Sequence, residues 1–387
     1  MTKQTNIVAD VNILRVLRFI WQHKDASRIK VASELGLDKS TVSKITSKLV
    51  DLGIVEEAAF GDSGVHGGRR PVFLKIKGHF ACVGGIEINP ERFVCCLIDL
   101  NGIVLFQWQE DISPQRYKEL GCKGIFYKAY ELISDTAKKL NISLVGIGVG
   151  VPGMVDSSLG KIVQSVSLMI ENPYDFISDI SSEINIPVFL ENDARCCCFG
   201  EKLLVNDESI LNMLFVLTEY RVIQPKTSSK KNLSVGMGLV LNGNMYRGQE
   251  ESAGEFRSML WDGGVGQFSS LVVSSDSSDF NSGSLEMVFH ELARHIAFLV
   301  NILNLDEVYI GGLGKDLTDR IVALVQECTK NQWPYGIPRK YKIKADSLGD
   351  FSVAYGAAAM VVEEFFSLPN LSGSPKKISF VMEQLRC

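Results

Sequence analysis

The chain has 387 residues, 46% of them hydrophobic and 22% charged, which is enough apolar material for two or three globular domains. Its longest nearly apolar run, residues 144–155, is interrupted by glycines and a proline and is far shorter than the ~20 residues that cross a bilayer. No apolar signal core follows the first six residues. We therefore expect a cytoplasmic protein without membrane contact.

The net charge of −5 is unevenly distributed along the chain. Residues 1–78 contain 13 Lys and Arg against 8 Asp and Glu, whereas the remainder contains 27 against 37. A basic N-terminal segment on an acidic body is typical of a nucleic-acid-binding module joined to a domain with another task.

The nine cysteines are odd in number and include no CxxC pair. Several stand side by side in apolar stretches, which favours small buried side chains in a reducing compartment. We predict neither a disulfide framework nor a metal site built on these cysteines.

Residues 11–52 have the pattern of three short helices, the last two forming a helix-turn-helix. Ala32 permits close helix contact, Gly36 permits a left-handed turn, and Val42 packs between the helices. The third helix then turns polar positions outward, where they would contact phosphates and base edges: Ser40, Thr41, Ser43, Lys44, Ser47 and Lys48. A generic three-helix core with a solvated face is the alternative.

A two-stranded wing after these helices argues against that alternative. Strands are predicted from Gly53 and over residues 72–76, and the Gly-rich segment between them carries Arg69 and Arg70. Two adjacent arginines at a wing tip are suited to phosphate or minor-groove contact. The set predicts a winged module that binds double-stranded DNA.

The body contains the same hairpin pattern twice, two apolar runs joined by an Asn-Gly turn. The turns are Asn101-Gly102 and Asn242-Gly243. The repeat predicts two related α/β halves, and a cleft between such lobes is a natural small-molecule site. Glycine-rich loops after the predicted strands at 145–153 and 307–314 fit close backbone approach to a ligand, although tight turns explain them equally well.

Asn192 and Asp193 follow a short apolar strand near the middle of the chain. In open α/β sheets ligands bind beyond the carboxyl ends of the strands, so this amide and carboxylate are candidate ligand contacts. Asn and Asp at such a position also cap the following helix, and the local sequence alone favours the cap.

Taken as an ordered set, the motifs resemble the ROK family of sugar-responsive repressors and sugar kinases, on the branch of xylose and N-acetylglucosamine repressors. The resemblance runs over nearly the whole length and rests on residues 28–50 with 68–71, 146–153, 191–194 with 200–201, 236–243, 248 with 253–255, and 310–312. It implies an α/β fold, an N-terminal winged helix-turn-helix followed by a two-lobed actin-like (ribonuclease H-like) sugar-kinase fold.

The same resemblance implies roles for particular residues. Asn192 and Asp193 would hydrogen-bond sugar hydroxyls, and Asp193 would be the catalytic base in a kinase. Glu255 and Glu286 match sugar-contacting glutamates. With the loop glycine and the residue at the family's histidine position, the candidate ligand-binding residues are Gly153, Asn192, Asp193, Glu255, Ser258 and Glu286.

The chain departs from the family pattern at the loop that wraps ATP phosphates in the kinases. Asn89 and Pro90 replace glycines there, which removes an amide donor and stiffens the backbone, and Glu91 adds negative charge. Phosphoryl transfer depends on positioning and charge neutralisation, so we predict no catalytic residues and no nucleotide cofactor.

A second departure concerns zinc. Ser258 stands at the position of a histidine ligand, and the family's three cysteines become Ser277, Asp279 and Ser284. Serine hydroxyls do not replace thiolates as Zn²⁺ ligands, so we predict no structural metal. A third departure is the polar segment 220–232, which has the composition of an exposed insertion in place of a second phosphate loop.

We accordingly expect a winged helix-turn-helix domain over residues 1–78, a first α/β lobe over 79–190 completed by a C-terminal helix at about 355–387, and a second lobe over 191–354. The predicted function is DNA-binding transcriptional regulation, as a repressor that senses a sugar or other metabolite without phosphorylating it, and that acts as a homodimer or higher homo-oligomer. An ATP-dependent sugar kinase with a regulatory N-terminal domain and a ligand-independent DNA-binding regulator are the alternatives.

Overall fold

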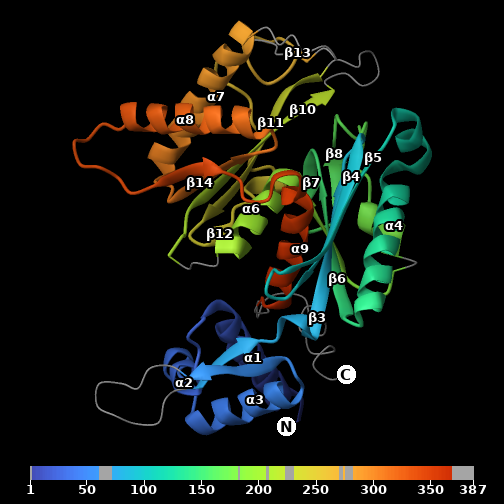
Figure 1. The fold of residues 1–387 in the computed structure, drawn as a ribbon, viewed down its shortest axis with the longest axis vertical. Coiled ribbons are helices and arrows are strands. Elements are labelled where there is room, and N and C mark those ends of the chain that lie inside the picture. The colour runs from blue at the N-terminus through green and yellow to red at the C-terminus, as the bar shows by residue number, and fades with distance from the viewer. Residues whose placement is uncertain are drawn as a thin grey trace.

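The chain begins with three helices and a two-stranded hairpin (Figure 1). The computed structural model describes residues 2–60, 72–181, 184–205, 209–222, 231–269, 273–274 and 282–367. The elements of this N-terminal module are α1 (Thr2–Gln22), α2 (Arg28–Leu35), α3 (Lys39–Asp51), β1 (Val55–Phe60) and β2 (Val72–Ile76). Gly36 ends α2 with a left-handed φ of 62°, and Val42 is fully buried. The predicted helix-turn-helix and wing strands are confirmed.

Two five-stranded paths with the same topology form the body. The first runs in the order β5-β4-β3-β6-β9, and the second in the order β12-β11-β10-β14-β15 with β13 beside β11. In each, the central strand, β3 or β10, pairs antiparallel with the first strand of a hairpin on one side. On its other side it pairs parallel with a strand that in turn pairs parallel with the edge strand. The bounds are β3 (Ala81–Ile88), β4 (Arg92–Asp99), β5 (Val104–Asp111), β6 (Ser143–Val151), β9 (Val188–Asn192), β10 (Met213–Val222), β11 (Lys231–Leu241), β12 (Asn244–Met245), β13 (Val273–Ser274), β14 (Glu307–Gly311) and β15 (Lys342–Ala345).

The repeated Asn-Gly turns lie where the sequence predicts them. Asn242 and Gly243 both have positive φ, at 52° and 75°, which is the geometry of a two-residue hairpin turn between β11 and β12. The first turn connects β4 to β5, with Gly102 at a φ of 81°. The two-lobed α/β architecture predicted from this repeat is confirmed.

Helices cover both faces of the two sheets, and two of them lie between the lobes. α4 packs on the outer face of the first sheet, and α7 and α8 pack on the second. α6 and α9 contact each other and face both sheets near the centre of the molecule (Figure 1). The remaining bounds are α4 (Pro114–Leu140), β7 (Met154–Asp156), β8 (Lys161–Gln164), α5 (Phe176–Ile180), α6 (Asp193–Val205), α7 (Ser282–Leu303), α8 (Lys315–Asn331) and α9 (Ser352–Phe365).

The cysteines behave as small apolar side chains. Seven of the eight that the structure describes are buried, and Cys328 is half-buried. Cys196, Cys197 and Cys198 follow one another in α6, where burial raises the pKa of each thiol. Within the described part of the chain no helix is long and apolar enough to cross a membrane.

α6 and α9 approach each other too closely for a side chain at Gly356. A Cβ atom added there would lie 1.8 Å from the carbonyl oxygen of Cys196, a backbone atom that moves only with its helix. Gly356→Val is therefore expected to lower the free energy of unfolding by roughly 2–3 kcal/mol, as overpacking a core does. Urea unfolding measures this, with Gly336→Ala as the control because nothing lies within 4 Å of a Cβ at that position. A loss equal to that of the control would contradict the close contact.

Candidate functional site

The outward face of α3 carries most of the predicted DNA-binding side chains. Ser40, Ser43, Lys44, Ser47 and Lys48 are exposed, and Thr41 is half-buried. Thr46 and Leu49 are buried on the opposite face. Arg69 and Arg70 lie outside the described residues.

α3 is held against the module by a polar brace. The Arg28 guanidinium donates to Thr46 Oγ1 at 3.0 Å and pairs with Glu57 of β1 at 2.8 Å. Thr46 Oγ1 in turn donates to the carbonyl of Val42 at 2.9 Å. α2, α3 and the wing strand are thus linked on the inner side, which leaves the lysine and serine face of α3 free for a duplex.

A cleft of about 480 Å³ opens between the two lobes of the body. It lies beyond the carboxyl ends of β6, β9 and β10, the place where open α/β sheets bind ligands. Four of the six predicted ligand-binding residues line it, namely Gly153, Asn192, Asp193 and Glu255. Arg221, Arg257, Gln164 and Gln267 line it as well.

Asn192 caps α6 and also joins the cleft wall. Its Oδ1 accepts from the backbone N–H of Arg195 at 3.2 Å, and its Nδ2 donates to the carbonyl of Gly153 at 3.0 Å. The helix-cap alternative is therefore confirmed for Asn192. Since both ends of the amide have protein partners, a ligand hydroxyl would share these atoms instead of finding them free.

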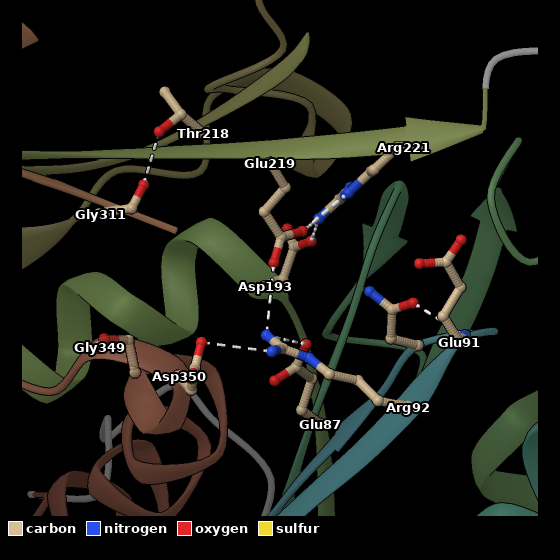
Figure 2. Close-up of polar contacts among 12 residues, drawn as sticks. Glu87, Glu91, Arg92, Asp193, Thr218, Glu219, Arg221, Gly311, Gly349 and Asp350 are labelled. Atoms are coloured by element: carbon tan, nitrogen blue, oxygen red, sulfur yellow. Dashed lines mark hydrogen bonds and ion pairs between the residues drawn. The ribbon is translucent and has the colours of Figure 1, made fainter. Parts of the chain in front are cut away.

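Asp193 is buried and paired with a cation. Its Oδ2 accepts from the guanidinium of Arg221, which also donates through Nε to Glu219 at 2.9 Å (Figure 2). Its Oδ1 accepts from the backbone N–H of Ala194 at 2.8 Å. Burial raises the pKa of Asp193, and the Arg221 guanidinium opposes that rise.

The pairing of Arg221 corrects the interpretation of residues 220–232 as an exposed insertion. Tyr220, Arg221 and Val222 end β10, and Lys231 and Asn232 begin β11, with Arg221 opposite Asn232 in the ladder. Polar composition made the segment resemble a loop, but its two ends pair with each other as strand residues of β10 and β11. Residues 223–230 lie outside the described part of the chain.

A second guanidinium joins the lobes where a kinase would hold nucleotide phosphates. Arg92 of β4 lies 3.5 Å from Glu87, 3.7 Å from Glu219 of the other lobe and 3.4 Å from Asp350 (Figure 2). Nearby, Lys231 pairs with Glu91 at 2.6 Å, again between the lobes. Burial raises the pKa of Glu87 to about 8, and the Arg92 guanidinium opposes that rise.

A buried ion cluster beside the cleft was not predicted from the sequence. Glu191 is fully buried and accepts from Arg195 Nε at 2.6 Å and from Arg247 Nη2 at 3.0 Å. Arg195 also donates to the carbonyl of Glu251 at 2.8 Å. The four-residue spacing of Glu191 and Arg195 was the one available signal. This cluster fixes the start of α6 to the loop that carries Glu255.

Glu255 faces the cleft with an exposed side chain, and the surrounding protein together with the Asp193 carboxylate raises its pKa. The other two predicted residues lie elsewhere. Ser258 is buried, and its hydroxyl lies 2.9 Å from His295 Nε2. Glu286 pairs with Arg320 and lies 3.4 Å from His290 on the surface of α7.

Hydrogen bonds hold the loop at 255–269. Gln267 bonds twice to the backbone of Val235, and Ser269 bonds to Glu291 of α7. With the Ser258–His295 bond, they connect the loop to both neighbouring elements. Within the described residues no group of three His, Cys, Asp or Glu side chains is arranged to hold a metal, and the absence of zinc remains a prediction.

The His295 contact predicts a loss of stability in acid. Burial lowers the pKa of His295, so the unfolded chain binds this proton more readily than the folded one. The stability that neutral His295 contributes to the folded state is fully present above the ordinary histidine pKa of about 6.5. It is lost as the pH falls through the lowered pKa of the folded state. Urea unfolding from pH 7.5 to 5 should therefore show a smaller fall for His295→Asn than for wild type. His290→Asn, at an exposed position, is the control, and equal falls in all three proteins would refute the assignment.

The geometry defines a class: a winged helix-turn-helix module joined to a two-lobed, actin-like sugar-kinase fold with an interlobe cleft. The ROK family pattern matches residues 83–262, and a winged helix-turn-helix DNA-binding pattern matches residues 10–56. The chain therefore contains a ROK family domain preceded by an N-terminal winged helix-turn-helix.

Two of the similar proteins described next align with nearly the whole chain, and the third aligns with about three quarters of it. The xylose repressor of Caldicellulosiruptor bescii is 23% identical over 411 residues, covering 94% of this chain and 98% of the relative. The crystal structure of a ROK family transcriptional regulator, a homologue of the E. coli MLC protein, aligns with a TM-score of 0.71 at 18% identity over 98% of this chain and all of that one. A ROK family glucokinase from Streptomyces griseus, in complex with glucose and AMPPNP, aligns with a TM-score of 0.53 at 15% identity over 72% of this chain and 99% of that one.

Proposed function

We propose that this protein is a transcriptional repressor that binds a DNA operator through α3 and the wing, and that senses a sugar or other small metabolite in its interlobe cleft without phosphorylating it. The observation that carries the proposal is the ion pair of Asp193 with Arg221 in a kinase-like body attached to a DNA-binding module. We further propose that the chain consists of a DNA-binding module over residues 1–78, a first lobe over 79–190 completed by the C-terminal helix from about residue 355, and a second lobe over 191–354.

The ion pair opposes a role for Asp193 in catalysis. A general base must accept a proton from the substrate hydroxyl, and both oxygens of this carboxylate already have protein partners, Arg221 on Oδ2 and the N–H of Ala194 on Oδ1. The phosphate position is also unfavourable. The turn at Asn89 closes on itself through a bond from its N–H to the carbonyl of Arg92, and Glu91 and Glu219 place carboxylates beside it.

An assay of ADP release distinguishes the proposed repressor from a sugar kinase. We expect no ADP release above background from the full-length protein with Mg-ATP across a panel of hexoses and pentoses. The control is Asp193→Asn, which removes the candidate base, so the two proteins should give equal rates. A sugar-dependent rate in wild type that disappears in Asp193→Asn would establish the kinase alternative.

α6 offers a physical connection between effector and operator. It begins at Asp193 in the cleft, and Phe199 in its middle belongs to the same apolar cluster as Leu17 and Ile20 of α1. Leu203, near the other end of α6, packs against that cluster. A ligand that moves the start of α6 would therefore bias the orientation of the N-terminal module. The ligand can shift the equilibrium between two orientations of the module only by the difference in its binding free energy for the two.

Electrophoretic mobility shifts with the upstream region of its own operon, titrated with candidate sugars, test both parts of the proposal. We expect binding by a homodimer to two half-sites, released by the effector. The absence of any protein-dependent shift at ~50–100 mM salt would refute operator binding there. A shift that no compound changes, together with no thermal shift across the panel, would support the ligand-independent regulator instead.

A further inference from the structure

A second cavity lies at the junction of the N-terminal module and the body, away from the interlobe cleft. It measures about 350 Å³, which is within the range of small-molecule pockets. α1 lines it with Arg18 and Trp21, α6 with Phe199 and Leu203, and α9 with Ala359. Residues outside these helices complete the wall: Ile210, Leu211 and Gly243. It is therefore shared between the part that binds DNA and the two helices that lie between the lobes.

The lining combines an apolar floor with one uncompensated charge. Trp21 stacks on Phe366 with ring centroids 4.7 Å apart, so this aromatic wall is fixed from behind. On the rim Lys202 is already paired with Glu363 at 2.7 Å. Arg18 donates only to the neutral side chain of Gln22, at 3.3 Å, and has no carboxylate partner among the described residues.

This chemistry selects one kind of ligand. The aromatic and aliphatic walls favour a planar apolar body, and the unpaired guanidinium favours a single negative charge at its edge. A sugar would leave most of its hydroxyls without partners against such a floor. We propose that the junction cavity binds a small aromatic monoanion, a carboxylate or a sulfonate, in contact with α1 and α6 together.

Equilibrium dialysis of the full-length protein with 8-anilino-1-naphthalenesulfonate, an aromatic monoanion, tests the site. We expect about one dye per chain. Leu203→Trp should weaken binding at least tenfold by filling the cavity, and Arg18→Gln should weaken it about tenfold by removing the charged partner. Leu204→Trp and Lys24→Gln are matched controls because both positions are exposed, and neither should change the affinity.

Three results would overturn the proposal: no dye bound, binding unchanged by Leu203→Trp, or equal losses in Leu203→Trp and Leu204→Trp. Circular dichroism of each variant verifies that it is folded. The dialysis contains neither DNA nor sugar, so its outcome does not depend on the proposed repressor function. An effect of the dye on operator affinity, which does rest on that function, is measured separately by mobility shift.

Discussion

Replacing Lys44 and Lys48 together by alanine is expected to weaken operator binding roughly 10- to 100-fold. Both lysines are exposed on α3, beside Ser43 and Ser47, and neither has an ion-pair partner among the described residues. Each ammonium that contacts a phosphate releases about one counterion, so each lost contact also lowers the salt dependence of binding. The slope of log affinity against log salt should fall by about one for each lysine replaced in a protomer.

The fold should tolerate this change because the buried face of α3 is untouched, and unfolding in urea verifies it. Lys138→Ala with Lys139→Ala on α4 is the matched control, since it removes the same charge from an exposed helix of the body. For this α4 control variant, the operator affinity and its salt dependence, measured by fluorescence anisotropy, should equal those of wild type. If the α3 variant loses no more affinity than the α4 control, the proposed DNA-binding face is wrong.

The parts of the fold that the sequence predicted are those fixed by local rules. A glycine with a left-handed φ ends α2, and Asn-Gly turns join β4 to β5 and β11 to β12, so each is recognisable from a few adjacent residues. The duplicated topology could be predicted because the hairpin with an Asn-Gly turn occurs in both halves.

The charge pairs at the cleft could not be predicted in this way. Arg221 and Asp193 are 28 residues apart, and Arg92 and Asp350 are 258 apart. Only the packing of α6 against β10, and the contact of the two lobes with each other, brings these groups together. The single amide of Asn192 both caps α6 and bonds to Gly153 in the cleft wall. From the local sequence, a helix cap and a place in the cleft were treated as alternatives.

Ion pairs between protein side chains also join the two lobes beside the cleft. Arg92 connects β4 to Glu219 across the lobes, and Lys231 connects to Glu91 beside it. A kinase needs a bound triphosphate to bring cationic and anionic groups into balance at this place. Here side chains of the protein supply both signs of charge, in the pairs of Arg92 with Glu219 and of Lys231 with Glu91.

Arg221→Met is expected to be the most destabilising single change at the cleft. It removes the cation from the buried Asp193 carboxylate and leaves Glu219 with the more distant Arg92 alone. Breaking a buried ion pair from one side costs roughly 3–5 kcal/mol because the remaining charge stays buried and unpaired. We expect a loss of that order in the free energy of unfolding at pH 7.5, measured in urea.

The pH dependence and a double variant identify the cause. Without Arg221, burial drives the pKa of Asp193 further up, so the folded variant gains a proton that the unfolded chain lacks, and its deficit against wild type should shrink as the pH falls. Arg221→Met combined with Asp193→Asn removes the unpaired charge and should recover much of the loss at pH 7.5. Asp193→Asn alone leaves Arg221 paired with Glu219 and should cost less than Arg221→Met. A deficit that is constant with pH, and that Asp193→Asn fails to reduce, would mean that Arg221 acts by packing and not as the counter-ion of Asp193.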